Sequence, residues 1–193
     1  CDESNIYGKK VVLRPAKVVV DEIEYIVKTT GMKYFGFADP VFNSPRKQMI
    51  EVISEIINRN LKIKFRVEMN PVGQDEESVK LLKKSGCIGV DFSPDSGSDV
   101  ILKNLRKGFD SQKVIEVANL YSKYKIPYSV GFLLGGPEEN EDTVKDTIKL
   151  AHNLPNSNVV YFTIGITVGG GHSDFDKIIG EDIRYKKSEH FKV

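Results

Sequence analysis

Residues 62–92, KIKFRVEMNPVGQDEESVKLLKKSGCIGVDF, contain the pattern that decides the fold. Lys62–Glu68 alternates apolar and polar residues, as a β-strand does, and Ile88–Phe92 is a second strand-like run. Between them, the spacing of the apolar residues predicts a helix over Asp75–Ser85, which Gly86 ends. A strand, a helix and a second strand in this order indicate a βα unit with parallel strands.

The same alternation extends in both directions from this unit. On the N-terminal side we expect a helix over Ala16–Thr30 that Gly31 ends, a strand over Tyr34–Ala38, and a helix from an N-cap at Ser44, with Pro45 in its first turn, to about Asn60. On the C-terminal side we expect a short helix over Asp99–Leu105, a helix from an N-cap at Asp110 to about Tyr124, a strand over Pro127–Leu134, a helix over Glu141–Asn153 and a strand over Val159–Val168. This order favours a parallel α/β sheet, either open and doubly wound or closed into a complete or partial barrel.

The bulk composition is that of one soluble globular domain. Of 193 residues, 40% are hydrophobic and 28% are charged. Lys+Arg 28 against Asp+Glu 27 gives a net charge of +1, so nothing in the balance indicates a nucleic acid or an anionic membrane as partner. No apolar run approaches the roughly 20 residues of a membrane span. We expect a core over residues 1–173 and a charged, irregular tail over residues 174–193.

The cysteine content suggests a reducing compartment. The two cysteines, Cys1 and Cys87, do not make a disulfide framework, so we expect a cytoplasmic protein. Cys87 comes between a predicted helix and a predicted strand, which favours a small buried core residue over a metal ligand. The three histidines are scattered, which argues against a zinc site.

The candidate ligand site lies where the predicted strands end, because parallel βα proteins bind ligands at the carboxyl ends of their strands. Acidic residues at such ends suit an amino group, and backbone groups and hydroxyls suit a ribose. Glycines let a ligand approach the backbone. The alternative is that the same residue types only form turns and N-caps. The strand ends are Asp39-Pro40, Glu68-Met69-Asn70, Asp95-Ser96-Gly97-Ser98, Gly135-Gly136-Pro137-Glu138 and Gly169-Gly170-Gly171.

Four stretches in register resemble one enzyme family, the radical S-adenosylmethionine (SAM) superfamily. GFLLGGPE (131–138) resembles its fifth-strand motif Gly-x-Ile-x-Gly-x-x-Glu, and the longer VGFLLGGPEENEDTVKDTI (130–148) is similar to the GxPgET…T passage of one subgroup. That subgroup includes methylthiotransferases, coproporphyrinogen dehydrogenases and cobalamin-dependent members. GVDFSPDSGSDVILKNLRKG (89–108) resembles its G-E-S-G-S…K-G passage, with Asp95 in place of Glu, and FADPVFN (37–43) occupies the second-strand place. The resemblance implies a partial (β/α)6 TIM-like barrel whose first strand and cluster loop are largely missing, that is, a core truncated at its N-terminus.

The resemblance also implies a role for individual residues in binding SAM. Asp39 would hold the amino group of the methionine part, and Asp95 and Ser96 would contact the ribose. Lys107 would pair with the methionine carboxylate, although it also suits the C-terminal dipole of a helix. The remaining implied cofactor-binding residues support the adenine region or end a strand beside it, and they are Glu68, Gly131, Gly135, Glu138 and Ile166.

The family signature Cys-x3-Cys-x2-Cys would provide the metal site, a 4Fe-4S cluster. Thiolates suit iron, and Cys1 falls where the third cysteine of that motif would fall. In the intact protein the cluster would cleave SAM reductively to a 5′-deoxyadenosyl radical, with an electron from an external donor. The subgroup also makes a cobalamin domain upstream compatible with the sequence. The resemblance leaves the substrate open and assigns no catalytic side chain.

Two other functions stay open from the sequence. One is a βα-barrel lyase or isomerase that binds a phosphorylated small molecule at Gly169–Gly171, with Glu68 and Asp95 as candidate carboxylates. The other is a catalytically inactive scaffold, because the cluster motif is incomplete in these residues. Two departures from the family pattern concern SAM affinity and the substrate side: Phe37-Ala38 stands before Asp39 in place of glycines, and the last strand ends VGGGHS (168–173) where the subgroup often has Pro-Gly-Thr. His172 in that loop could face a substrate, although a histidine exposed to solvent is the favoured interpretation.

Overall fold

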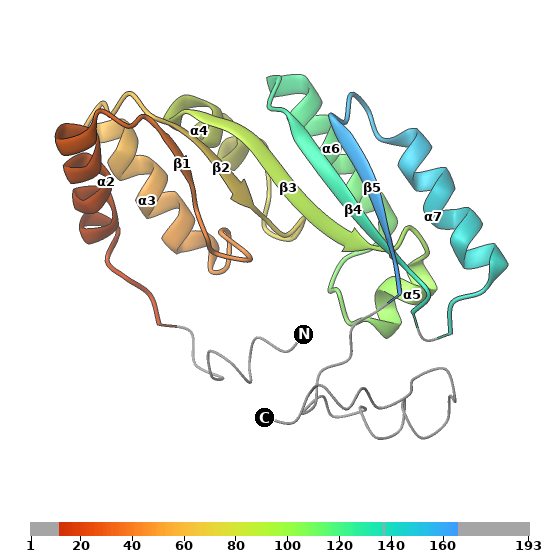
Figure 1. Ribbon diagram of the computed structural model, residues 1–193. Coiled ribbons are helices and arrows are strands. Elements are labelled where there is room, and N and C mark those ends of the chain that lie inside the picture. Colours follow the sequence, from red (N-terminus) through yellow and green to blue (C-terminus); the bar gives the residue numbers. More distant parts are fainter. Residues whose placement is uncertain (1–11, 137, 166–193) are drawn as a thin grey trace. The chain divides into compact units, whose positions relative to one another are not determined.

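The fold is a parallel α/β sheet with helices on one face. The computed structural model describes residues 12–136 and 138–165, and its compact unit spans Arg14–Gly165. All strand pairs are parallel, and the spatial order β1-β2-β3-β4-β5 equals the chain order (Figure 1). The strands are β1 (Tyr34–Gly36), β2 (Lys64–Glu68), β3 (Cys87–Asp95), β4 (Tyr128–Leu134) and β5 (Val159–Ile164). The predicted α/β class is confirmed.

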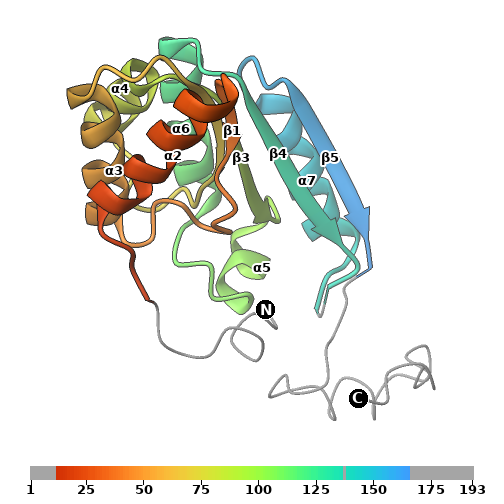
Figure 2. The ribbon, with the colours of Figure 1, turned by 60° about the vertical axis from the view of Figure 1, so that its left-hand side comes forward.

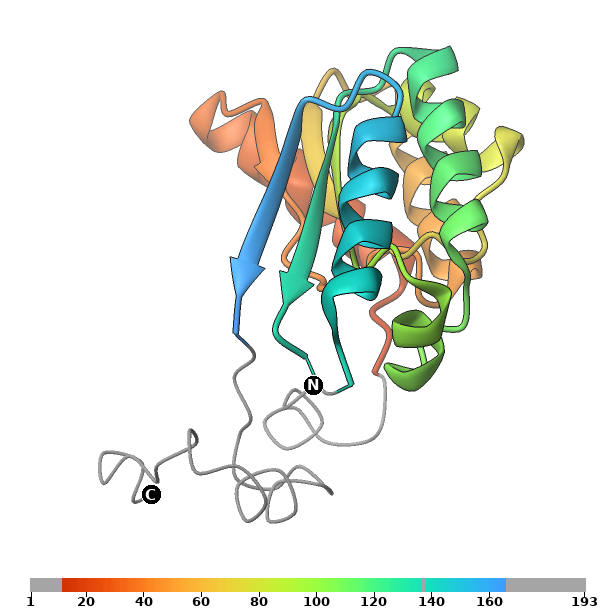
Figure 3. The same ribbon diagram turned by 90° about the vertical axis from the view of Figure 1, so that its right-hand side faces the viewer.

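The helices form a row behind the sheet. Helices α3 and α4, α4 and α6, and α6 and α7 are neighbours, and α2 packs on α3 (Figures 2 and 3). In the described part of the chain, the other face of the sheet carries no helix; we call it the inner face. None of the described helices is both long and apolar enough to cross a membrane. The helices are α2 (Ala16–Thr30), α3 (Arg46–Asn58), α4 (Glu76–Ser85), α5 (Asp99–Asn104), α6 (Ser111–Tyr124) and α7 (Glu141–Asn153).

Local signals explain four of the helix ends. The carboxylates of Asp75 and Asp110 accept hydrogen bonds from the backbone N–H groups of Ser78 and Lys113, each at 2.8 Å. These bonds satisfy donors that a helix leaves unpaired at its N-terminus. At the other end, Gly31 and Gly86 adopt φ values of 72° and 103°, a left-handed conformation that glycine reaches without strain. The cap at Asp110 and the stops at Gly31 and Gly86 were predicted from the sequence and are confirmed, whereas Asp75, predicted as the first residue of its helix, is the N-cap of α4.

Strand alternation separates the two faces of the sheet. In β2, Phe65 and Val67 are buried under the helices, whereas Lys64, Arg66 and Glu68 are exposed on the inner face. The core consists of such helix-side residues together with the apolar faces of α3, α4 and α6. Burial of this apolar surface provides most of the driving force for folding. The sheet therefore has one face built for packing and one polar face.

Two predicted details differ from the structure. Ser44 is not the N-cap of α3: Pro45 takes that position, because the Pro45 carbonyl accepts the first helical bonds, from the backbone N–H groups of Gln48 (3.1 Å) and Met49 (3.4 Å). Strand β3 is longer than predicted, begins at Cys87 and includes Asp95. Phe65 pairs with Cys87 and Arg66 with Gly89, so Ile88 is an extra residue in a bulge.

The remaining strands begin or end close to their predicted bounds. Strand β2 begins at Lys64 and β1 ends at Gly36, each two residues inside the predicted run. Strand β5 is described as far as Ile164. The residues predicted to continue it, and the predicted tail over residues 174–193, lie outside the described part, so the domain bounds stay predictions.

Candidate functional site

The predicted strand ends meet at one edge of the sheet, because all described strands run parallel. Asp39 follows β1 and Glu68 is the last residue of β2, and both side chains are exposed. Within the described residues, neither carboxylate has a hydrogen bond or an ion pair. Two unpaired carboxylates at the carboxyl edge leave acceptors available for a cationic group such as a ligand ammonium.

Asp95 and Lys107, which the sequence assigned to the same ligand, contact each other directly. Their carboxylate and ammonium form an ion pair, and both side chains are mostly buried, with 28% and 21% of their area exposed. The Lys107 ammonium also donates to the Ser93 carbonyl at 3.2 Å. Lys107 therefore points to the end of β3, and the alternative role as a dipole cation of α5 is not what these contacts show.

Ser96 and its neighbours attach the loop after β3 to helix α7. The Ser96 hydroxyl lies 3.1 Å from the Thr147 hydroxyl and accepts a bond from the Ser98 backbone N–H at 3.1 Å. The Gly97 N–H donates to the same Thr147 hydroxyl at 2.9 Å, and a Cβ at Gly97 would lie only 2.7 Å from Thr147 Cα. The Ser96 side chain is fully buried. In this state its hydroxyl holds the loop, and a ribose contact by Ser96 stays a prediction.

Gly131 makes room for an aromatic ring on the inner face. A Cβ at Gly131 would lie 2.6 Å from Cζ of Tyr161, its partner on β5. The missing side chain lets the Tyr161 ring lie across β4, where its hydroxyl is 3.4 Å from the Ser93 hydroxyl. Tyr161 was not predicted from the sequence, because its contact with Gly131 depends on the register between β4 and β5.

Two adjacent glutamates in the turn after β4 make different hydrogen bonds. Glu138 has φ 64° and accepts a bond from the Asn104 side-chain amide at 2.6 Å, which ties this turn to the end of α5. Glu139 instead turns back and accepts the N–H of Gly135, which itself has φ 90°. The other Glu139 carboxylate oxygen, Oε1, is buried and has no hydrogen-bond partner among the described residues. The GxPgET reading of this passage puts its Glu at 139, so the sequence did contain a signal for the residue that was missed.

Several predicted site residues lie outside the described part: Cys1, Ile166, His172 and Gly169–Gly171. The other cysteine, Cys87, is buried beneath the helices, with 2% of its area exposed. Burial raises the pKa of its thiol to about 11, so it stays protonated near neutral pH. Cys87 is thus a core residue, as predicted.

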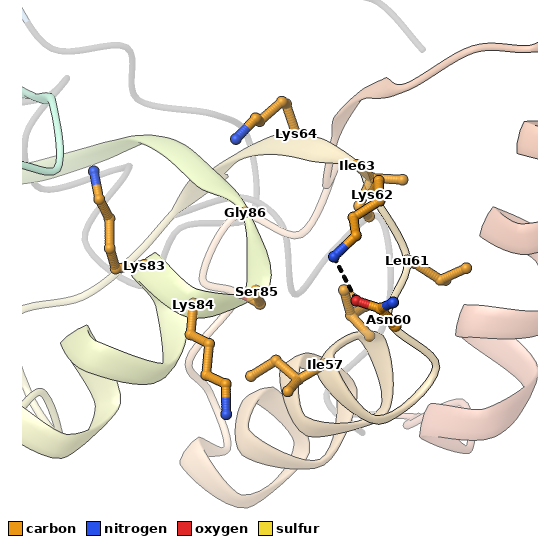
Figure 4. A pocket seen from close by; sticks show the side chains of 11 residues that line it. Ile57, Asn60, Leu61, Lys62, Ile63, Lys64, Lys83, Lys84, Ser85 and Gly86 are labelled. Atoms are coloured by element: carbon orange, nitrogen blue, oxygen red, sulfur yellow. Dashed lines mark hydrogen bonds between the residues drawn. The ribbon is translucent and has the colours of Figure 1, made fainter.

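A hollow of about 520 Å³ lies away from these residues, at the amino ends of β2 and β3 (Figure 4). Ile57 and Leu61 are among its apolar lining, and its rim includes four lysines, at positions 62, 64, 83 and 84. Ligands of parallel βα proteins bind at the opposite end of the strands. The size of this hollow is therefore a poor guide to the ligand site, and the polar carboxyl edge of the sheet is the better candidate for that site.

The fold and this edge define a class, a parallel βα protein with a polar ligand site at the carboxyl ends of its strands. Residues 1–151 match the Radical SAM superfamily, which is more than half of the chain. The chain belongs to this superfamily of enzymes, whose members use a 4Fe-4S cluster and SAM.

Sequence similarity to two relatives supports the placement in this superfamily. An uncharacterized methyltransferase of Pyrococcus horikoshii is 27% identical over 154 residues, which cover 80% of this chain and 34% of the relative. An anaerobic magnesium-protoporphyrin IX monomethyl ester cyclase of Rubrivivax gelatinosus is 27% identical over 143 residues, 73% of this chain and 26% of the relative. The chain thus spans about a third or less of the length of these relatives.

Solved structures show the same fold. The radical SAM methyltransferase TsrM of Kitasatospora setae, solved with cobalamin and a [4Fe-4S] cluster, superposes with a TM-score of 0.74 at 24% identity, covering 80% of this chain and 30% of that one. Coproporphyrinogen III oxidase of Escherichia coli gives a TM-score of 0.63 at 12% identity over 82% of this chain and 40% of that one. The predicted relation to radical SAM barrels is confirmed at the level of the fold.

Proposed function

We propose that this chain is the SAM-binding part of a radical SAM enzyme and that SAM lies along the carboxyl edge of β1–β4. The observation that carries the proposal is the Asp95–Lys107 pair, held at the end of β3 by the Ser93 carbonyl. A lysine and several carboxylates at one edge suit a zwitterionic methionine group with a ribose. In the superfamily, SAM and the cluster together supply a 5′-deoxyadenosyl radical.

The described residues fit SAM without any change in the fold. Asp39 has no partner in the described part and is free to accept hydrogen bonds from an ammonium group. Lys107 can exchange its bond to Asp95 for one to a ligand carboxylate, which leaves Asp95 free to accept from a ribose hydroxyl. The buried, unpartnered Oε1 of Glu139 lies in the turn after β4, where it can accept a further donor.

The described residues do not supply the cluster. Cys87 is buried and protonated, and Cys1 lies outside the described part. We propose Cys1 as one thiolate ligand, with further thiolates from beyond these residues, and we derive no step through the cluster. Cobalamin, which the TsrM structure contains, is a proposed cofactor of the whole enzyme, bound by another domain.

Equilibrium dialysis with radiolabelled SAM tests the site on the 193-residue chain and tolerates weak binding. We expect saturable binding that the double change Asp95→Asn with Lys107→Gln weakens at least tenfold, because it removes both charges of the Asp95–Lys107 pair. Lys103→Gln is the matched control, since Lys103 is exposed on nearby α5 and has no ion pair to a described residue. Equal SAM affinity in the double variant and in the wild type would contradict the site.

A further inference from the structure

The inner face of the sheet is not packed as a barrel interior usually is. In parallel barrels, bulky branched residues such as Val, Ile and Leu fill the interior in layers. Here the inner-face residues of β2 and β3 are charged, polar or glycine, and β4 adds one bulky apolar residue, Leu133. The set comprises Lys64, Arg66, Glu68, Gly89, Asp91, Ser93, Ser129, Gly131 and Leu133. The other bulky residues of this face lie on the outer strands β1 and β5, and they are Tyr34, Val159 and Tyr161.

Arg66 lies between two glycines on this face. It pairs in register with Gly36 on β1 and with Gly89 on β3. A Cβ at Gly89 would lie 3.1 Å from Arg66 Nε, whereas a Cβ at Gly36 would meet nothing within 4 Å. The Arg66 side chain therefore lies against the backbone of β3, and the space on its β1 side is open.

Asp91 fixes the far end of the same side chain. Arg66 Nη2 donates to both carboxylate oxygens of Asp91, at 2.9 and 3.0 Å. Nε and Nη1 have no hydrogen bond to any described residue, so several donors of the guanidinium are available. Exposed ion pairs add little to stability, and 55% of the Arg66 side chain is exposed, so stability gives a weak reason for this arrangement.

Glu68 adds a second carboxylate at the same height. It pairs in register with Asp91, and within the described residues its side chain has no partner. One guanidinium thus stands beside two carboxylates. A simple anion would meet a net negative surrounding here. A ligand with a carboxylate and an adjacent ammonium finds a partner for each charge, because the guanidinium suits the carboxylate and Glu68 suits the ammonium.

We infer that Arg66, Glu68 and Asp91 form a binding site for the α-amino-acid group of the substrate. The inference rests on the proposed function, since it assigns the substrate side of the same enzyme. Asp91 pairs with Ser129 and Asp95 with Phe132, three residues further along β4, so the site lies about 10 Å of strand below the Asp95–Lys107 pair. That spacing places an amino-acid group on the inner face, with the rest of the substrate directed toward the carboxyl edge.

SAM also carries an amino-acid group, so the test must separate the two ligands. The 193-residue chain, labelled with ¹⁵N, is titrated with L-alanine, with propionate, which lacks the ammonium, and with L-alaninamide, which lacks the carboxylate. We expect saturable shifts of the Gly36 and Gly89 backbone amide signals with L-alanine, and at least tenfold weaker binding of the other two probes. No saturable shift, or equal binding of propionate and L-alanine, would overturn the inference.

Variants then identify the side chains. Arg66→Gln should abolish L-alanine binding and Glu68→Gln should weaken it several-fold, whereas Arg106→Gln, an exposed arginine after α5, should leave it unchanged. Unchanged amide signals elsewhere show that each variant folds. SAM affinity, measured by dialysis, should be the same in Arg66→Gln as in the wild type. Loss of SAM affinity in that variant would overturn the inference, because Arg66 would then belong to the SAM site. Absence of SAM binding in the wild type with L-alanine binding intact would instead contradict only the proposed function.

Discussion

The two faces of the sheet are built from alternate residues of the same strands, yet they differ in nearly every property. On the helix face, Phe65, Val90 and Phe132 are almost wholly buried among aromatic and branched side chains. On the inner face, the neighbouring Arg66, Asp91 and Gly131 leave charges, hydroxyls and open space. A strand of period two thus lets one face hold the fold while the other is free to bind.

The largest contrast is expected between two adjacent residues of β2. Phe65→Ala removes a fully buried ring that packs edge-on against Phe37 (5.3 Å between ring centres) and should lower the free energy of unfolding by about 3–5 kcal/mol. Arg66→Gln, on the inner face, should cost less than about 1 kcal/mol. Urea denaturation measures both. Similar losses in the two variants would mean that the inner face is also part of the structural core.

Two glycines give the next largest contrast. A Cβ at Gly97 would lie 2.9 Å from the Asp146 carbonyl, a backbone atom that cannot move away, so Gly97→Ala should cost about 3 kcal/mol. At Gly131 the obstacle is the end of the Tyr161 side chain, which is 43% exposed and can swing aside, so Gly131→Ala should cost about 1 kcal/mol. Thermal unfolding ranks the two. Adding Tyr161→Ala to Gly131→Ala should cost less than the two changes summed, and strict additivity would show that the ring is not the obstacle.

Cys87 tests whether burial on the helix face keeps a thiol unreactive. Because burial raises the pKa of its thiol to about 11 in the folded chain, it should react with iodoacetamide at pH 8 only after unfolding. The raised pKa means that the folded chain keeps a proton that the unfolded chain loses. The free energy of unfolding should therefore fall as the pH rises from about 9 to 11, and Cys87→Ala should reduce that fall.

Tyr128, whose pKa burial raises to about 12, adds to the decline at higher pH, so the difference between the variant and the wild type is the quantity to compare. Rapid alkylation of Cys87 in the folded chain would show that this region opens.

The smallest effect is expected at Glu76, on the exposed surface of α4. Hydrogen bonds from Tyr124, Lys123 and Lys80 hold the pKa of this carboxyl at about 2. The contribution of Glu76 is present above the unfolded-state pKa near 4.5 and is lost as the pH falls toward 2. Glu76→Gln should therefore flatten the pH dependence of unfolding slightly over that range. Glu77→Gln, with its side chain 80% exposed, is the control and should show no such change.

Much of the fold followed from local sequence. The helix cap at Asp110, the stops at Gly31 and Gly86 and the alternation of β2 all depend on residues close together in the chain, and the structure confirms them. The predicted N-cap at Ser44 was wrong because the carbonyl of Pro45, one residue later, accepts the first helical bonds, and the residue type of Ser44 does not reveal at which carbonyl the helix begins. The bulge at Ile88 was also missed, since a bulge appears only when two strands are paired.

The sequence by itself determined the order of strands and helices, the edge where strand ends gather and, through four motifs, the superfamily. Tertiary structure alone decided which of those residues meet. It paired Asp95 with Lys107, bound Ser96 to Thr147 on α7, and laid Tyr161 across Gly131. The physical reason is that period and capping are local properties of the chain, whereas contacts between strands depend on register, and one bulged residue shifts every pairing beyond it.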